Sequence, residues 1–145
     1  MLKSKVLLPS DGSPTAIKAA AYAARLMKLN PDMKLDILVI VQDEEENKGT
    51  NIEKDLHDLT NGPVLAAGQD ILNKTLKIFV EEGQEVGGYI EQGDPASKIV
   101  NFAEKGSYDH IIMGSRGVSQ LRGTAIGSVS HQVIQQAKCR VTLVK

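Results

Sequence analysis

Residues 108–134 read YDHIIMGSRGVSQLRGTAIGSVSHQVI, and this stretch decides the class of fold. The segment from Tyr108 to Met113 is typical of a strand, and it runs directly into a segment rich in glycine and serine. Beyond Gly127, apolar residues return at helical spacing. A strand that leads through a glycine-rich loop into a helix is a building unit of α/β proteins, so we predict that class.

The rest of the chain alternates between strand-like and helix-like patterns in the same way. Proline after a capping residue marks helix starts at Ser13-Pro14 and Asp94-Pro95. The sequence predicts strands over 5–8, 35–41, 85–91, 108–113 and 140–145, with helices over 14–29, 63–82, 95–105 and 128–137. Val129, Val133, Ile134 and Ala137 are expected to share one face of the last helix. Residues 42–62 are expected to form a loop with one short helix near 52–59.

This order of elements predicts a five-stranded parallel sheet with helices on both faces. The nearly continuous apolar run over 35–41 is typical of a strand that is buried on both faces. In such sheets, ligands bind beyond the carboxyl ends of the strands, where the strand order reverses. Two polar segments follow such ends, namely residues 9–12 after the first strand and the glycine-rich segment after the fourth.

Composition excludes several classes of function. The 145 residues carry 17 Lys and Arg against 18 Asp and Glu, and this balance argues against non-specific binding of nucleic acid or a membrane surface. One cysteine excludes an internal disulfide framework and any cysteine-rich metal site. The amino-terminal residues lack the long apolar core of a secretory signal, so we expect one cytoplasmic domain spanning residues 1–145 without membrane insertion.

The glycine-rich segment has the chemistry of an anion site. The helix that begins after Gly127 presents unpaired backbone N–H groups, and glycine lets backbone approach an anion closely. Ser128 and Ser130 add hydroxyl groups, and Arg116 or Arg122 adds charge. The chain contains neither the GxxxxGK[ST] nor the GxGxxG phosphate motif. On composition alone, a flexible loop that happens to contain glycine is an equal alternative.

The spacing Gly114-x2-Gly117-x9-Gly127-Ser128 resembles the G-x2-G-x9-G-[ST] signature of the ATP-binding branch of the universal stress protein family. The resemblance extends over VLLPSDGSPTAIKAAAYAARL (6–26), GDPASKIVNFAEKGSYDHIIMGSRG (93–117) and SVSHQVIQQAKCRVTLVK (128–145), and is weakest over 42–62. It implies an adenine nucleotide alpha hydrolase-like fold with strand order 3-2-1-4-5. It also implies a nucleotide across the carboxyl ends of strands 1 and 4.

Positions that match the family imply a set of nucleotide contacts. At the adenosine end these are Pro9, Ser10 and Asp11, with the backbone of Val41 against the base. The ribose and phosphates would border Met113, Gly114, Arg116 and Gly117, and the phosphates would be held by Gly127, Ser128, Val129 and Ser130. Asp11 is open to three interpretations: a turn-forming residue, a contact to adenosine, or a residue that orients Mg²⁺ through water. The segment 118–126 is expected to be a mobile loop over the phosphates.

The resemblance favours an ATP-binding regulatory protein of the stress response that acts on an unidentified protein partner. The nucleotide could be ATP, ADP or AMP, with Mg²⁺ as a candidate companion. Because the chain has no P-loop lysine and no obvious general base, we expect very slow ATP hydrolysis at most. A slow ATPase or phosphotransferase, or a dimeric scaffold without nucleotide, are the alternatives. A homodimer through the last strand, Val141–Lys145, is expected. Arg140 replaces a common family proline there and adds charge near that edge.

The remaining candidate residues are expected to be structural. Ser13 is expected to be the cap of the first helix rather than a nucleophile. The three histidines, His57, His110 and His131, lie far apart without the spacing of metal ligands. Cys139 is expected at the end of the last helix as a small buried residue.

Overall fold

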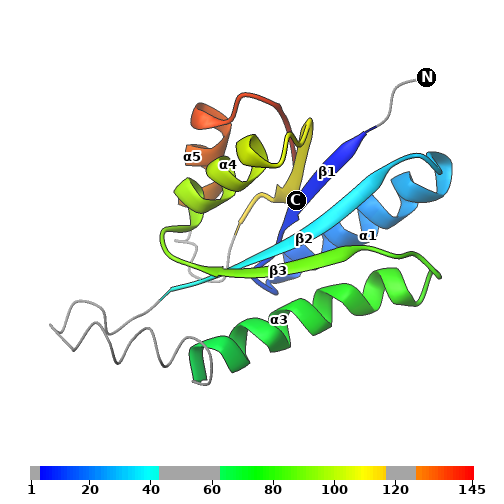
Figure 1. Ribbon diagram of the computed structural model, residues 1–145, viewed down its shortest axis with the longest axis horizontal. Helices are drawn as coiled ribbons and strands as arrows, with labels where there is room; N and C mark the ends of the chain where they lie inside the picture. The colour runs from blue at the N-terminus through cyan, green and yellow to red at the C-terminus, as the bar shows by residue number, and fades with distance from the viewer. Residues whose placement is uncertain (1–3, 43–62, 117–126) are drawn as a thin grey trace, which may run out of the picture.

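A computed structural model of the chain describes residues 4–42, 63–116 and 127–145. In these ranges, strands and helices alternate in the order that the sequence predicts (Figure 1). The strands are β1 (Lys5–Pro9), β2 (Lys34–Val41), β3 (Gly87–Gln92), β4 (His110–Gly114) and β5 (Arg140–Val144). The helices are α1 (Pro14–Leu29), α3 (Pro63–Val80), α4 (Pro95–Lys105) and α5 (Ser128–Gln136). The short helix expected near 52–59 lies outside the described residues.

The five strands form one sheet in the order β3-β2-β1-β4-β5, and each neighbouring pair is parallel. The predicted fold class and strand order are therefore confirmed. The chain builds the sheet outward from β1 to β3 and then returns to add β4 and β5 on the other side of β1. The strand order thus reverses between β1 and β4, which is the position where open α/β sheets bind ligands.

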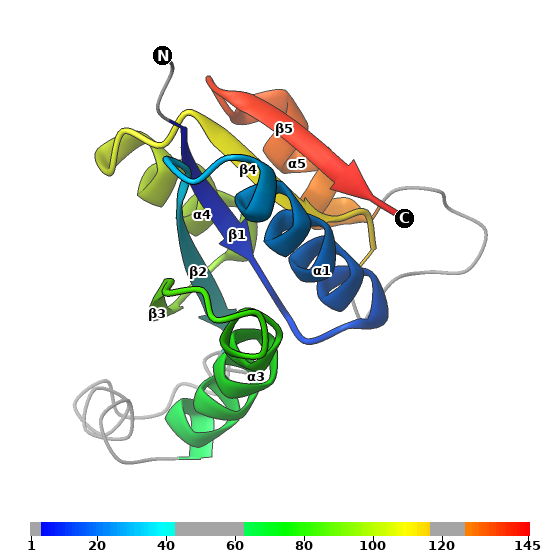
Figure 2. The ribbon, with the colours of Figure 1, turned by 90° about the vertical axis from the view of Figure 1, so that its right-hand side faces the viewer.

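Among the described residues, two helices cover each face of the sheet, with α1 and α3 on one side and α4 and α5 on the other (Figure 2). Side chains of β1 alternate between the two faces because successive residues of a strand point in opposite directions. Val6 and Leu8 lie in the core beneath α1 and α3, whereas Leu7 lies in the core with Leu38 and Ile111 beneath α4 and α5. Burial on both faces explains the continuous apolar runs of the central strands.

The helix starts confirm the predicted caps. The Ser13 hydroxyl accepts the Ala16 N–H at 3.3 Å, and the Asp94 carboxylate accepts the Ser97 N–H at 3.1 Å. Proline follows each cap at the first helical position, where no backbone N–H is needed. Gly106 is the C-cap of α4, as the sequence predicts.

The structure differs from the sequence prediction at several element ends and on one helix face. β3 begins at Gly87 rather than at 85, and β4 at His110 rather than at 108. Ile134 is 44% exposed, so it does not share the buried face of α5. That face carries Val129 and Val133, and Ile134 is turned away from it because successive helical residues are about 100° apart.

The unusual glycine pair of β3 has a packing explanation. A Cβ at Gly87 would collide with the Asp36 carboxylate of β2. A Cβ at Gly88 would lie 2.9 Å from Leu72 Cδ1 of α3, which is closer than van der Waals contact allows.

Within 4–42, 63–116 and 127–145, the structure contains no helix with the length and apolar character that a membrane span requires.

Candidate functional site

The expected site residues gather at the carboxyl edge of the sheet, around the reversal between β1 and β4. Three backbone segments meet there: the turn after β1 (Ser10–Ser13), the exit of β4 (Gly114–Arg116) and the first turn of α5 (Gly127–Ser130). The first segment precedes the other two by about 100 residues in sequence, and the parallel topology brings all three to one edge. Gly117 lies outside the described residues, as does the segment 118–126.

The turn after β1 is held by its own side chains. The Asp11 carboxylate accepts the Ser13 N–H at 2.9 Å, and the Ser10 hydroxyl accepts the Gly12 N–H at 3.2 Å. Gly12 has a φ of +78°, a conformation that glycine adopts without a steric penalty. The turn-forming interpretation of Asp11 is therefore observed, and a role in ligand binding remains a prediction.

The exit of β4 packs against the first turn of α1. A Cβ at Gly114 would lie 2.7 Å from both the Ala16 nitrogen and the Thr15 carbonyl carbon, so only glycine fits there. The Ser13 and Thr15 hydroxyls both donate to the Arg116 carbonyl oxygen, at 3.2 and 2.5 Å. The glycine at position 114 thus has a structural cause, because it allows α1 to begin directly beside β4.

The first turn of α5 is tied to the same segment. The Gly127 N–H donates to the Ser115 carbonyl at 2.6 Å, and the Ser130 hydroxyl donates to the Gly114 carbonyl at 2.9 Å. The Ser130 hydroxyl proton is therefore used inside the protein. Gly127 provides no capping side chain, so the N–H groups of Ser128 and Val129 lack both an intrahelical partner and a side-chain cap from that position.

Three apolar residues that are expected to contact the nucleotide, Pro9, Val41 and Met113, lie at or next to the ends of their strands. Pro9 ends β1 and is buried, and Met113 is buried one residue before the end of β4. Val41 ends β2, and its carbonyl accepts the Gly93 N–H at 3.1 Å. A carbonyl oxygen has two lone pairs, so this one retains the capacity to accept a second hydrogen bond, such as one from a base.

Two residues of α3 that sequence reasoning did not select reach the turn after β1. The Thr75 hydroxyl lies 2.9 Å from the Ser10 hydroxyl, and the Lys74 ammonium donates to the Gly12 carbonyl at 2.9 Å. Thr75 is fully buried. The signal that could have found it is a hydroxyl on the otherwise apolar face of α3.

Tyr108 and His110, near the opposite, amino-terminal edge of the sheet, have shifted pKa values. Burial and the hydrogen bond to Asp36 raise the pKa of the Tyr108 phenol, which donates to the Asp36 carboxylate at 2.6 Å. Burial lowers the pKa of His110, as does the nearby Arg140 guanidinium, whereas Asp109 opposes this shift. The His110 ring pairs with the Thr142 hydroxyl at 2.7 Å, across β4 and β5. These bonds have structural roles.

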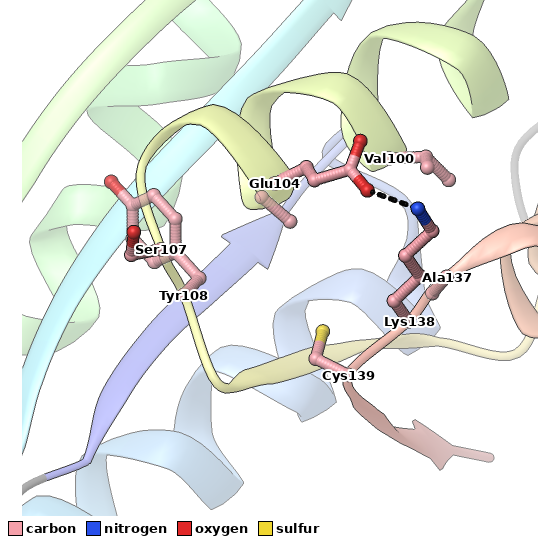
Figure 3. Close-up of a pocket in the computed structure, with 8 residues that line it drawn as sticks. Val100, Glu104, Ser107, Tyr108, Ala137, Lys138 and Cys139 are labelled. Carbon is pink, nitrogen blue, oxygen red and sulfur yellow. Dashed lines mark ion pairs between the residues drawn. The ribbon is translucent and has the colours of Figure 1, made fainter.

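A pocket of about 180 Å³ also lies at that opposite edge, between the carboxyl-terminal ends of α4 and α5 (Figure 3). It contains none of the expected nucleotide contacts. Cys139 contributes its thiol to the lining, and burial raises the pKa of this thiol. Cys139 lies between α5 and β5 rather than at the end of the helix. The Lys138 ammonium and the Glu104 carboxylate form an ion pair of 3.0 Å beside the pocket (Figure 3).

Metal coordination by side chains alone finds no support among the described residues. In these ranges, no group of three or more His, Cys, Asp or Glu side chains could hold a metal ion. Asp11 is the only acidic residue of the turn after β1.

The profile described as the universal stress protein family matches residues 3–145. A universal stress protein of Methanocaldococcus jannaschii is 33% identical over 145 residues, which cover 99% of this chain and 83% of the relative. The universal stress protein YxiE of Bacillus subtilis is 30% identical over 147 residues, which cover 98% of this chain and 99% of the relative.

Solved structures share the fold along the whole chain. That of the hypothetical protein MJ0577 has a TM-score of 0.82 at 28% identity, covering 100% of this chain and 97% of that one. A universal stress protein in complex with cAMP has a TM-score of 0.71 at 22% identity, covering 98% and 97%. An Arabidopsis thaliana family protein with AMP bound has a TM-score of 0.68 at 19% identity, covering 98% and 91%.

Proposed function

The chain belongs to the universal stress protein family, and from this premise we propose that it binds ATP at the carboxyl edge of its sheet and acts as a nucleotide-dependent regulator. The observation that carries the proposal is the meeting of three backbone segments at the β1–β4 reversal. One of them is a helix amino terminus whose cap position is a glycine. Structural neighbours solved with AMP and with cAMP add support, since both ligands are adenine nucleotides.

Backbone groups at the start of α5 are the proposed phosphate site. The N–H groups of Ser128, Val129 and Ser130 point along the helix axis toward its amino terminus, where the helix dipole favours an anion. Ser130 would contribute through its N–H, because its hydroxyl already donates to the Gly114 carbonyl. Ser128 is exposed, so its hydroxyl is available as a second donor.

The turn after β1 and the end of β2 are the proposed adenosine site. Pro9, Ser10 and Asp11 would border the nucleoside, with the Val41 carbonyl toward the base. Met113, Gly114 and Arg116 would border the ribose and phosphates, together with Gly117. Because Ser10 is buried with its hydroxyl against Thr75, its contact with a ligand would be made through its backbone.

Magnesium would accompany the nucleotide rather than occupy a protein cage. Mg²⁺ keeps several waters and is commonly held by one or two carboxylates together with phosphate oxygens. Asp11 fits this role as a single carboxylate that already accepts the Ser13 N–H through one oxygen. We therefore propose that Asp11 orients hydrated Mg²⁺ through water.

Calorimetric titration with ATP and Mg²⁺ at up to millimolar concentration tests this function, with AMP and cAMP as parallel ligands. We expect saturable binding that Gly127→Val abolishes, because a branched side chain would obstruct the approach of phosphate to the helix. The φ of Gly127 is −72°, a value that valine also adopts, so the fold should persist. Ala137→Val is the matched control, since it enlarges a residue at the other end of α5 beside the pocket. Absence of saturable ATP binding by the unmodified protein would refute the proposal.

The sheet edge formed by β5 is the proposed dimer interface, through Val141–Lys145. β5 is the last strand of the sheet, so one side of it has no strand neighbour among the described residues. The nearby charge of Arg140 is partly offset by Asp109 of the same chain, 3.5 Å away. The Val144 carbonyl accepts the Ser115 N–H of the β4 side, so the backbone of the preceding residue, Leu143, faces the open edge. Sedimentation velocity should detect a dimer that Leu143→Pro dissociates, because proline removes the backbone N–H donor at that edge. A monomer at every concentration would contradict the dimer.

A further inference from the structure

Ser10 and Thr75 form a buried chain of hydrogen bonds whose direction follows from proton counting. The Thr75 hydroxyl donates to the Ile71 carbonyl at 2.9 Å, which uses its single proton. In the 2.9 Å contact between the two hydroxyls, Ser10 must therefore be the donor. The Ser10 oxygen in turn accepts the Gly12 N–H at 3.2 Å. Each group in this series of hydrogen bonds therefore donates to the next, from the Gly12 N–H through the Ser10 and Thr75 hydroxyls to the Ile71 carbonyl.

These hydrogen bonds join α3 to the turn after β1 at a site that is buried from solvent. Thr75 is 0% exposed and Ser10 is 6% exposed, so water cannot readily replace either partner. One helical residue earlier, the Lys74 ammonium holds the Gly12 carbonyl. The N–H and the carbonyl of Gly12 are therefore both restrained by α3, directly or through Ser10. Gly12 is also the residue at which the turn adopts its positive φ.

The Thr75 hydroxyl satisfies its own proton within α3, at the Ile71 carbonyl, and its oxygen serves the turn as an acceptor. A buried hydroxyl without partners is strongly unfavourable, and a buried polar pair is favourable only when every member is satisfied. Valine would fill the same volume on the apolar face of α3 without that requirement. Threonine, unlike valine, has a side-chain oxygen that accepts the Ser10 proton. This hydrogen bond fixes one orientation of the turn.

We propose that Thr75 is a positioning residue for the nucleotide site, acting through Ser10 on the Ser10–Ser13 turn. The inference rests on the proposed nucleotide binding at that turn. Replacing Thr75 by valine leaves the Ser10 proton without its acceptor, so Ser10 turns and releases the Gly12 N–H. The turn then samples several conformations, and the ligand must select the competent one, which weakens its apparent affinity.

Three variants test the proposal through the Kd of Mg-ATP, measured well below the melting temperature of each protein. Thr75→Val should raise the Kd roughly tenfold, the equivalent of one lost hydrogen bond to a buried donor. Thr75→Ser restores the acceptor and should return the Kd to within about threefold of the original value. Phe79→Leu is the matched control, because it perturbs a fully buried residue one turn further along α3 without touching the turn after β1. It should lower the melting temperature and leave the Kd unchanged.

Hydrogen exchange of the Gly12 amide separates this proposal from the proposed function. Thr75→Val should increase the Gly12 exchange rate and Phe79→Leu should not, whether or not ATP binds. If Thr75→Val does not fold, Ser10→Ala removes the same link from the other side and should give the same exchange result. Unchanged Gly12 exchange in Thr75→Val, or a Kd of Thr75→Ser as weak as that of Thr75→Val, would overturn the positioning role. Absence of ATP binding by the unmodified protein would refute only the nucleotide function.

Discussion

Gly114→Ala is the substitution for which the structure predicts the clearest effect. The added Cβ would lie 2.6 Å from Thr15 Oγ1 and 2.7 Å from two backbone atoms, the Ala16 nitrogen and the Thr15 carbonyl carbon. Side chains can rotate away from such a collision, whereas the first turn of α1 moves only as a unit. Overpacking of a filled core costs about 1–3 kcal/mol, and a backbone obstacle places this variant near the upper end.

We expect Gly114→Ala to lower the free energy of unfolding by roughly 2–3 kcal/mol. For a domain of this size, that corresponds to a fall in melting temperature of about 6–9 °C. The displacement of α1 also widens the β1–β4 reversal, because Ser13, the cap of α1, and Thr15 in its first turn hold the Arg116 carbonyl. Affinity for Mg-ATP should therefore fall at least about tenfold, measured by calorimetry below the unfolding transition.

Gly83→Ala is the matched control for this experiment. A Cβ at Gly83 would meet nothing within 4 Å, but its φ of +71° penalises any side chain, at a cost of about 1–2 kcal/mol. This variant should lose stability without losing affinity. The double variant Gly114→Ala with Thr15→Ala should not recover stability, because both backbone atoms remain in place. If urea unfolding of Gly114→Ala agrees with the unmodified protein within about 0.5 kcal/mol, the packing of α1 against β4 described above is wrong.

Three further predictions follow from individual contacts. Ser13→Ala and Asp94→Ala each remove a helix cap and should cost about 1 kcal/mol in urea unfolding, but only Ser13→Ala should also weaken ATP binding; equal affinities would contradict the site. Tyr108→Phe removes a hydrogen bond to the Asp36 carboxylate and should cost about 1–3 kcal/mol with an unchanged Kd for ATP; no loss of stability would show that bond to be unimportant. His110 has a lowered pKa in the folded protein, so the unfolded chain binds its proton first as the pH falls. Stability should therefore decrease as the pH falls below about 6.5, less steeply in His110→Gln, and equal pH slopes would exclude this histidine as the cause.

Local sequence signals predicted the elements of the fold well, because their causes are local. A cap followed by proline marks the starts of α1 and α4, and the apolar run over 35–41 marks a strand buried on both faces. The errors arose where packing between elements decides. The start of β3 and the exposure of Ile134 depend on which neighbouring strand or helix covers each residue, and no local pattern records this.

Within the site, residue positions were predictable, but the tasks of their side chains were not. The family resemblance predicts that Ser10 and Ser130 lie beside a bound nucleotide, and in the structure both hydroxyls make hydrogen bonds within the protein. Their partners, Thr75 and the Gly114 carbonyl, are 65 and 16 residues away in sequence. A single sequence does not reveal which of several nearby acceptors a buried hydroxyl will choose. The same limit concealed the contact between Gly114 and α1, since glycine in a loop is equally compatible with close packing and with ligand approach.

The most direct test of the central claim is an amide NMR titration with Mg-ATP, which locates the ligand on the sheet. Binding at the proposed site should give saturable shifts concentrated at the carboxyl edge, in the segments Ser10–Ser13, Gly114–Arg116 and Gly127–Ser130. Amides around the pocket at the opposite edge, near Tyr108 and Cys139, should change little. Shifts concentrated at that opposite edge, or no saturable shifts at millimolar ATP, would contradict nucleotide binding at the β1–β4 reversal.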